Sequence, residues 1–210
     1  MSGMNRGAFG AIELISVLAI LAILTALVLP RVLQTTKVTQ ARQTVNEAHL
    51  TQVMATLQAL QPAITAHLAQ FGSLASRNGT PLPFSETYDN FGQVLLTEGL
   101  IERPFELSLG TNATLRLVKM SQVTRDTQVD GSNGIYDLDG DGKSDTAGTG
   151  CVLEAVIPDV REVEARALND RLDGPRLGAG EGNNDFVGRV IYRAAGPGGM
   201  TTVHIYLLHQ

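Results

Sequence analysis

The chain has a single cysteine, Cys151, among its 210 residues, so no disulfide can form within it. Histidine is also scarce: His49, His67, His204 and His209 are scattered, and with one cysteine they lack the spacing of a zinc site. Only 16 lysines and arginines stand against 21 acidic residues, and a net charge of −5 argues against direct binding of nucleic acid. A hydrophobic content of 43% excludes wholesale disorder.

Patterns that would indicate catalysis are missing as well. No Ser-His-Asp, Cys-His or paired-carboxylate arrangement stands out, and there is no phosphate-binding loop. Cys151 begins an apolar stretch, where we expect a buried core thiol rather than a nucleophile. The sequence therefore predicts a protein that is not an enzyme.

The most informative stretch is at the N-terminus, where a short polar leader precedes an almost unbroken apolar run from Phe9 to Leu29. A bilayer-spanning helix needs about 20 residues, and this run has 21. Glu13 is the one charge in the run, although a carboxylate near a membrane core costs about 2.5–3.5 kcal/mol on insertion scales. A removed signal peptide and a plain anchor are simpler interpretations. Neither accounts for Glu13, and the passable cleavage site, at 24–26, is inside the run.

Three residues in this region stand at informative distances: Phe9 is four residues before Glu13, and Pro30 is seventeen after it. Together with the segment RGAFGAIEL at 6–14, they resemble the prepilin N-terminus of type IV pilins and type II secretion pseudopilins. The resemblance implies that a prepilin peptidase cuts just before Phe9, that the new amine is methylated, and that Pro30 bends the helix. That family usually has glycine before the cut, whereas Ala8 stands here and Gly7 is one residue earlier. We favour cleavage between Ala8 and Phe9, because cleavage after Gly7 would put Glu13 and Pro30 out of phase.

The same resemblance implies an assembly role for Glu13. After cleavage the chain would begin with a positive amine, which Glu13 of a neighbouring subunit can neutralise. Burying that pair costs far less than burying either charge alone. As partners we expect copies of this chain and other pilin-like subunits in a helical filament, a prepilin peptidase, an inner-membrane assembly platform and membrane lipid. The expected location is the bacterial inner membrane, crossed once, with the globular part in the periplasm.

Beyond Pro30 the sequence becomes amphipathic. Apolar residues recur at steps of mostly three and four from Val38 to Phe71, which predicts one face of a helix. Pro62 marks a point where that helix could kink or break. The histidines at 49 and 67 fall on it without an acidic or cysteine partner at ligand spacing, so we expect surface or packing roles for them.

The remaining residues predict a globular part of mixed structure. A loop at 73–83 precedes a short helix that includes Tyr88 and Leu95 and ends at Gly99, and a second helix runs from Asp159, as its N-cap, to Leu172. Four segments combine apolar alternation with β-branched or aromatic residues and are predicted strands: Thr114 to Met120, Cys151 to Ile157, Phe186 to Arg193 and Thr202 to Leu208.

This order of elements predicts an α+β fold. With the family resemblance, the expectation is pilin-like: a long N-terminal helix, membrane-spanning in its first half, packed on an antiparallel sheet. The predicted divisions are a leader peptide at 1–8, a transmembrane or filament-core helix at 9–30, its amphipathic continuation at 31–72, and a globular head at 73–210.

The segment DLDGDGKSD at 137–145 is the one cluster with metal-ligand spacing. Such a loop can turn several carboxylates inward, and Ca²⁺ takes six to eight oxygen ligands. It is not an EF-hand, because Gly148 stands where the closing glutamate would be, but it resembles the short calcium loops of many extracytoplasmic domains. The expected ligands are four carboxylates and one backbone carbonyl, with Asp130 as the nearest further carboxylate: Asp137, Asp139, Asp141, Asp145 and the carbonyl of Lys143. The alternative is a solvated acidic turn.

The sequence thus predicts a structural subunit of a type IV pilus-like filament. We favour a type II secretion pseudopilin, because there is no cysteine pair and the loop at 137–145 suggests calcium, which several pseudopilins use. A type IV pilin for adhesion, motility or DNA uptake is the close alternative. A membrane-anchored, calcium-binding periplasmic domain is the alternative of another class.

Overall fold

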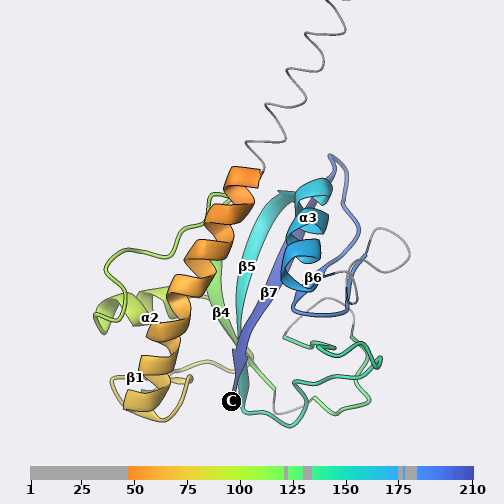
Figure 1. The fold of residues 1–210 in the computed structure, drawn as a ribbon. Coiled ribbons are helices and arrows are strands. Elements are labelled where there is room, and N and C mark those ends of the chain that lie inside the picture. The colour runs from red at the N-terminus through yellow and green to blue at the C-terminus, as the bar shows by residue number, and fades with distance from the viewer. Residues whose placement is uncertain (1–46, 121–122, 130–133, 175–176, 178–183) are drawn as a thin grey trace, which may run out of the picture. The chain divides into compact units, whose positions relative to one another are not determined.

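The computed structural model of the chain describes residues 47–120, 123–129, 134–174, 177 and 184–210 (Figure 1). Ala48–Gln210 forms a compact unit. The predicted leader, the apolar run, and the residues Gly7, Ala8, Phe9, Glu13 and Pro30 lie outside the described residues, as does Asp130.

The first described element is a helix over residues 47–71, here called the N-terminal helix. Its buried side chains recur at helical spacing and form one face: Leu50, Val53, Leu57, Leu60, Ala63, Ile64 and His67. The helix continues through Pro62 and ends at Phe71, before Gly72, whose φ of 70° is in the left-handed region that favours glycine. The predicted amphipathic stripe is therefore confirmed over 47–71.

A five-stranded antiparallel sheet forms the centre of the domain, with the order β3-β4-β5-β7-β6. The strands are β3 Thr87–Tyr88, β4 Thr114–Lys119, β5 Cys151–Arg161, β6 Val190–Tyr192 and β7 Met200–His209. All four strand predictions fall on this sheet, although the one at 186–193 shortens to three residues. The predicted loop at 73–83 contains a small hairpin, β1 Ser76–Arg77 with β2 Thr80–Pro81.

Two shorter helices flank the sheet. The predicted short helix is α2, Phe91–Thr97, but Tyr88, which was predicted to be part of it, lies in β3 because it pairs with β4. The second predicted helix is α3, Glu162–Leu172, whose N-cap is Arg161. The start at Asp159 was wrong, because β5 continues to Arg161 and its backbone pairs with β7 there. Val163, an apolar residue of this helix, is 66% exposed.

The sheet has an apolar cluster on each side. Alternate residues of β4 and β5, such as Leu117 and Leu153, pack with the N-terminal helix, α2 and α3 in the larger cluster. The smaller cluster includes Val118 and Val152 from the other side of the same strands. It packs with Tyr136, from the glycine-rich stretch between β4 and β5, so that stretch covers the second face.

The predicted fold class requires correction. The helix that the structure describes covers 47–71, and among the described residues no helix is long and apolar enough to cross a membrane. The physical reason is that this helix has one buried apolar face and polar residues elsewhere, which suits a sheet on one side and water on the other. The described residues between β4 and β5 form neither helix nor strand, so the fold is only weakly α+β rather than the pilin-like arrangement predicted.

Candidate metal centre

The acidic loop, residues 137–145, follows directly on a buried anchor. Tyr136 is fully buried, and its hydroxyl donates a hydrogen bond to Oε2 of Glu154 on β5 at 2.6 Å. Burial, the charge of Glu154 and this hydrogen bond raise the pKa of the Tyr136 phenol well above its usual value. The loop therefore begins at a fixed point on the second face of the sheet.

Glu154 is itself fully buried within a small polar network. The Nε atom of Arg116 donates to its Oε1 at 2.7 Å, and Nδ1 of His204 lies 3.5 Å from the same oxygen. Burial alone would raise the pKa of the Glu154 carboxyl, but His204, Arg116 and Tyr136 outweigh burial, and the pKa is lowered. The carboxylate is thus kept charged beneath the loop, with partners from β4 and β7.

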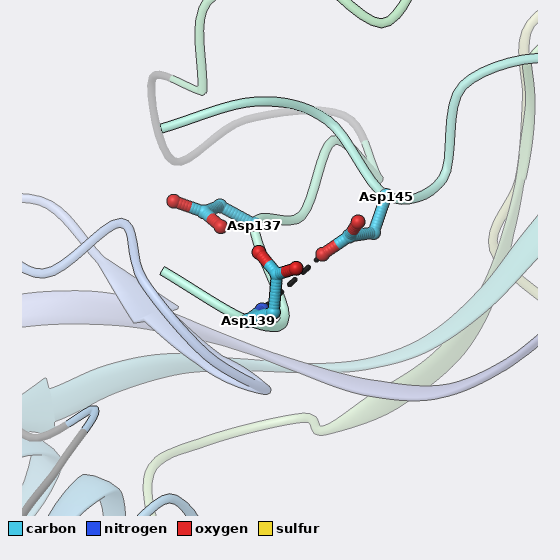
Figure 2. Close-up of side chains that lie close together, drawn as sticks. All are labelled: Asp137, Asp139 and Asp145. Carbon is cyan, nitrogen blue, oxygen red and sulfur yellow. Dashed lines mark hydrogen bonds between the residues drawn. The ribbon is translucent and has the colours of Figure 1, made fainter. Parts of the chain in front are cut away.

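Three of the predicted ligands come together in the loop, as Figure 2 shows. Asp137, Asp139 and Asp145 each have a carboxylate oxygen within 4.8 Å of the others. Asp137 is buried, at 2% exposure, Asp145 is half-buried, and Asp139 is exposed. Carboxylate oxygens this close together could hold a metal ion, and Ca²⁺ at these three residues stays a prediction.

Backbone N–H groups hold the carboxylates in place. Oδ1 of Asp137 accepts from the N–H of Gly140 at 2.7 Å, and its Oδ2 accepts from the N–H of Gly142 at 2.9 Å. Both glycines have φ above 80°, which lets the chain turn so tightly around the carboxylate. Oδ2 of Asp145 accepts from the N–H groups of Leu138 and Asp139, at 2.6 and 3.2 Å. These donors partly offset the repulsion between the carboxylates.

The other two predicted ligands lie differently. The carboxylate of Asp141 is 3.3 Å from the Arg125 guanidinium and falls outside the group of three. The backbone N–H of Lys143 donates to Oδ1 of Asp141 at 2.9 Å. The structure therefore brings together three of the four predicted carboxylates and turns the fourth toward a cation of the protein.

A second buried carboxylate near this region was not predicted. Asp185 is 1% exposed. Its Oδ2 accepts a hydrogen bond from the side chain of Asn169 on α3, and its Oδ1 accepts from the N–H of Val187 at 3.0 Å. Burial raises the pKa of the Asp185 carboxyl to about 6. Just beyond it, the N–H of Gly188 donates to the carbonyl of Asp137 at 2.6 Å, so this segment joins α3 to the acidic loop.

His67 has a partner that its sequence neighbourhood does not reveal. Its Nδ1 lies 2.6 Å from Oε2 of Glu98, and the two side chains are 0% and 1% exposed. Its Nε2 lies 3.2 Å from the carbonyl oxygen of Ser73, which can only accept, so Nε2 is the donor of this hydrogen bond. The pair joins the N-terminal helix to the end of α2. Glu98 is 31 residues away, at no motif spacing, so no signal in the sequence could have found it.

Cys151 is buried as predicted, at 4% exposure, and burial raises the pKa of its thiol to about 11. A thiol with so high a pKa is almost wholly protonated at neutral pH, which suits a core residue.

Comparison with known proteins adds no relative: no family model, no curated protein and no solved structure matches this chain.

Proposed function

We propose that the chain is a structural subunit of a type IV pilus-like filament, most specifically a type II secretion pseudopilin, and not an enzyme. One observation carries the proposal: Phe9, Glu13 and Pro30 stand four and seventeen residues apart within and at the end of a 21-residue apolar run. A carboxylate is costly in such a run unless it has a charge to neutralise. The amine that cleavage before Phe9 would create supplies that charge.

In this proposal a prepilin peptidase removes the leader and methylates the new amine. The subunit waits in the bacterial inner membrane, held by its N-terminal segment, with residues 48–210 in the periplasm. At the assembly platform, Glu13 of one subunit pairs with the amine of its neighbour and sets the stagger between them. Glu13 is thus an assembly residue.

The preference for a secretion pseudopilin rests on the globular part. With one cysteine, the chain cannot fasten the stretch between β4 and β5 by a disulfide. We propose that Ca²⁺ does so instead, held by Asp137, Asp139 and Asp145, whose carboxylate oxygens lie within 4.8 Å of one another. A type IV pilin for adhesion, motility or DNA uptake is the second candidate, favoured by the same N-terminal spacing.

The assembly role is tested by replacing Glu13 with alanine in cells that produce the filament. The Glu13→Ala chain should be cut normally and stay in the membrane, but fail to appear in sheared filaments. Asp126→Ala, which removes an exposed carboxylate from the globular part, should assemble like the wild type. Normal incorporation of Glu13→Ala would refute the proposed role and favour the membrane-anchored periplasmic domain, which needs neither processing nor Glu13.

The calcium site is tested by thermal unfolding of the detergent-solubilised protein with and without a chelator. Chelation should lower the melting temperature, and Asp145→Asn should abolish the difference, because it removes a carboxylate of the group of three. Asp126→Asn serves as the control. A wild-type melting curve that chelator and added Ca²⁺ both leave unchanged would show that the loop is a solvated acidic turn.

A further inference from the structure

A groove of about 560 Å³ lies between the N-terminal helix and α3. Its apolar lining comes from the N-terminal helix, α3 and β7, and its charged groups are two arginines: Met54, Leu57, Leu172 and Leu207, with Arg171 and Arg189. Among the described residues that line this groove, here called the cationic groove, none is an aspartate or a glutamate. It therefore offers apolar surface beside positive charge.

The two arginines are available to a partner's carboxylates. Arg171 donates to the neutral hydroxyl of Thr51 at 3.2 Å, and it is exposed. Arg189 is half-buried, and its charge acts at longer range on Asp173, where it helps to lower the pKa of a carboxyl that burial raises. Among the described residues, neither guanidinium lies within ion-pair distance of a carboxylate.

An acidic segment with matching chemistry lies elsewhere on the same domain. Residues 102–106 follow α2, and Glu102 and Glu106 are both exposed. Between them, Pro104 is exposed and Phe105 is half-buried, with one cation, Arg103. Two carboxylates beside Pro104 and the exposed part of Phe105, whose remainder packs on the larger cluster, complement a groove with an apolar floor and two guanidinium groups.

The groove and the acidic segment belong to different sides of the domain. α2 packs on β4, toward one edge of the sheet, whereas α3 packs on β6, at the other edge. Figure 1 shows α2 and α3 on opposite sides of the N-terminal helix. One chain therefore cannot fill its own groove with its own segment, but a second copy can. The segment at 31–46, which includes Arg31, Lys37 and Arg42 and no acidic residue, has the wrong charge for the groove.

We infer that the cationic groove binds residues 102–106 of a second copy of this chain. Because the two surfaces differ, the contact is heterologous, and a heterologous contact that does not close into a ring repeats without limit and builds a helical filament. This inference rests on the proposed function and deepens it, since it names a contact between globular domains that would act beside the pairing of Glu13.

The contact is tested by cysteine cross-linking of the full chain in the membranes and filaments of producing cells. Gln61 lines the groove and Arg103 lies in the acidic segment, so a Gln61→Cys/Arg103→Cys chain should give a ladder of multimers with a short thiol cross-linker. Gln61→Cys/Asp126→Cys is the matched control and should give none. Bands that contain another protein in place of a second copy would overturn the inference, as would the absence of a ladder.

Charge reversal then tests the chemistry. Arg171→Glu with Arg189→Glu should reduce the ladder several-fold, and adding Glu102→Arg with Glu106→Arg should restore it. Arg171→Glu alone, at an exposed site, should give a smaller loss in a chain that still folds. A ladder that charge reversal leaves unchanged would overturn the inference.

The two proposals fail separately. If filaments assemble but no cross-linked ladder forms, the groove contact is refuted and the proposed filament function stands. If the ladder forms but the Glu13→Ala variant still enters filaments, the assembly role of Glu13 is refuted and the groove contact stands.

Discussion

The buried pair of His67 and Glu98 gives the most direct test of how the domain is held together. His67→Phe keeps a ring of similar size, so the contacts of this ring with Phe71 and Phe91, each at a centroid distance of 5.1 Å, can persist. It removes both ring nitrogens and leaves the Glu98 carboxylate buried without its partner at 2.6 Å. Breaking a buried pair in this way typically costs about 3–5 kcal/mol.

Removing both partners should lower the free energy of unfolding much less than removing His67 alone. In His67→Phe/Glu98→Met no buried charge remains, and replacing a buried pair by apolar groups is often close to neutral. The carbonyl of Ser73 loses its donor in this variant, and the N–H of Asn78, which bonds to Glu98 at 3.0 Å in an exposed place, can turn to water. We expect a total loss of about 1 kcal/mol, the usual net value of one hydrogen bond.

The assay is the unfolding free energy of the detergent-solubilised full chain, from near-ultraviolet circular dichroism and hydrogen exchange in the N-terminal helix. His49→Phe, at a half-buried position on the same helix, is the control and should cost less than about 1 kcal/mol. If His67→Phe costs no more than the double variant, the pair does not carry the stability argued here.

Three further changes probe the sheet and its loops. Tyr136→Phe removes a donor to buried Glu154 and should cost about 1.5–3 kcal/mol, with faster hydrogen exchange over the described residues 134–146; unchanged exchange would refute the anchoring role. Asp185 has a folded pKa of about 6 against 3.8 for the free carboxyl, so the folded state holds more protons and stability falls as pH rises between these values. Asp185→Asn should abolish this decrease in the free energy of unfolding across the same pH range. A decrease that persists in the variant would show that another group causes it. Gly110→Ala would place a Cβ 2.2 Å from a backbone carbonyl oxygen and should destabilise clearly more than Gly79→Ala, which shares a positive φ but meets open space; equal melting temperatures would contradict this.

Local patterns predicted much of the sheet. Apolar alternation placed strands at Thr114 and Cys151 within a residue of where β4 and β5 begin, because one set of alternate residues must face the helices. The start of α3 could not be read in the same way. Asp159 is a good helix-capping residue, but pairing of β5 with β7 extends the strand through it, and tertiary pairing overrides the local preference.

In the candidate site, too, the sequence predicted contacts within one loop but not contacts between distant segments. Spacing was enough to bring Asp137, Asp139 and Asp145 together, since these residues lie on one tight loop. It could not show that Asp141 turns to Arg125, sixteen residues earlier, or that Tyr136 fixes the loop to Glu154. Those contacts depend on how the stretch between β4 and β5 folds back over the sheet, and no periodicity encodes that path.

The central claim is that this chain is processed as a prepilin, and one measurement tests it most directly. The protein is extracted from the membranes of the cells that naturally produce it, and its mass and N-terminal sequence are determined. The account predicts a chain that begins at Phe9 with a methylated amine. An intact leader, or a chain that begins near Leu27, would contradict it.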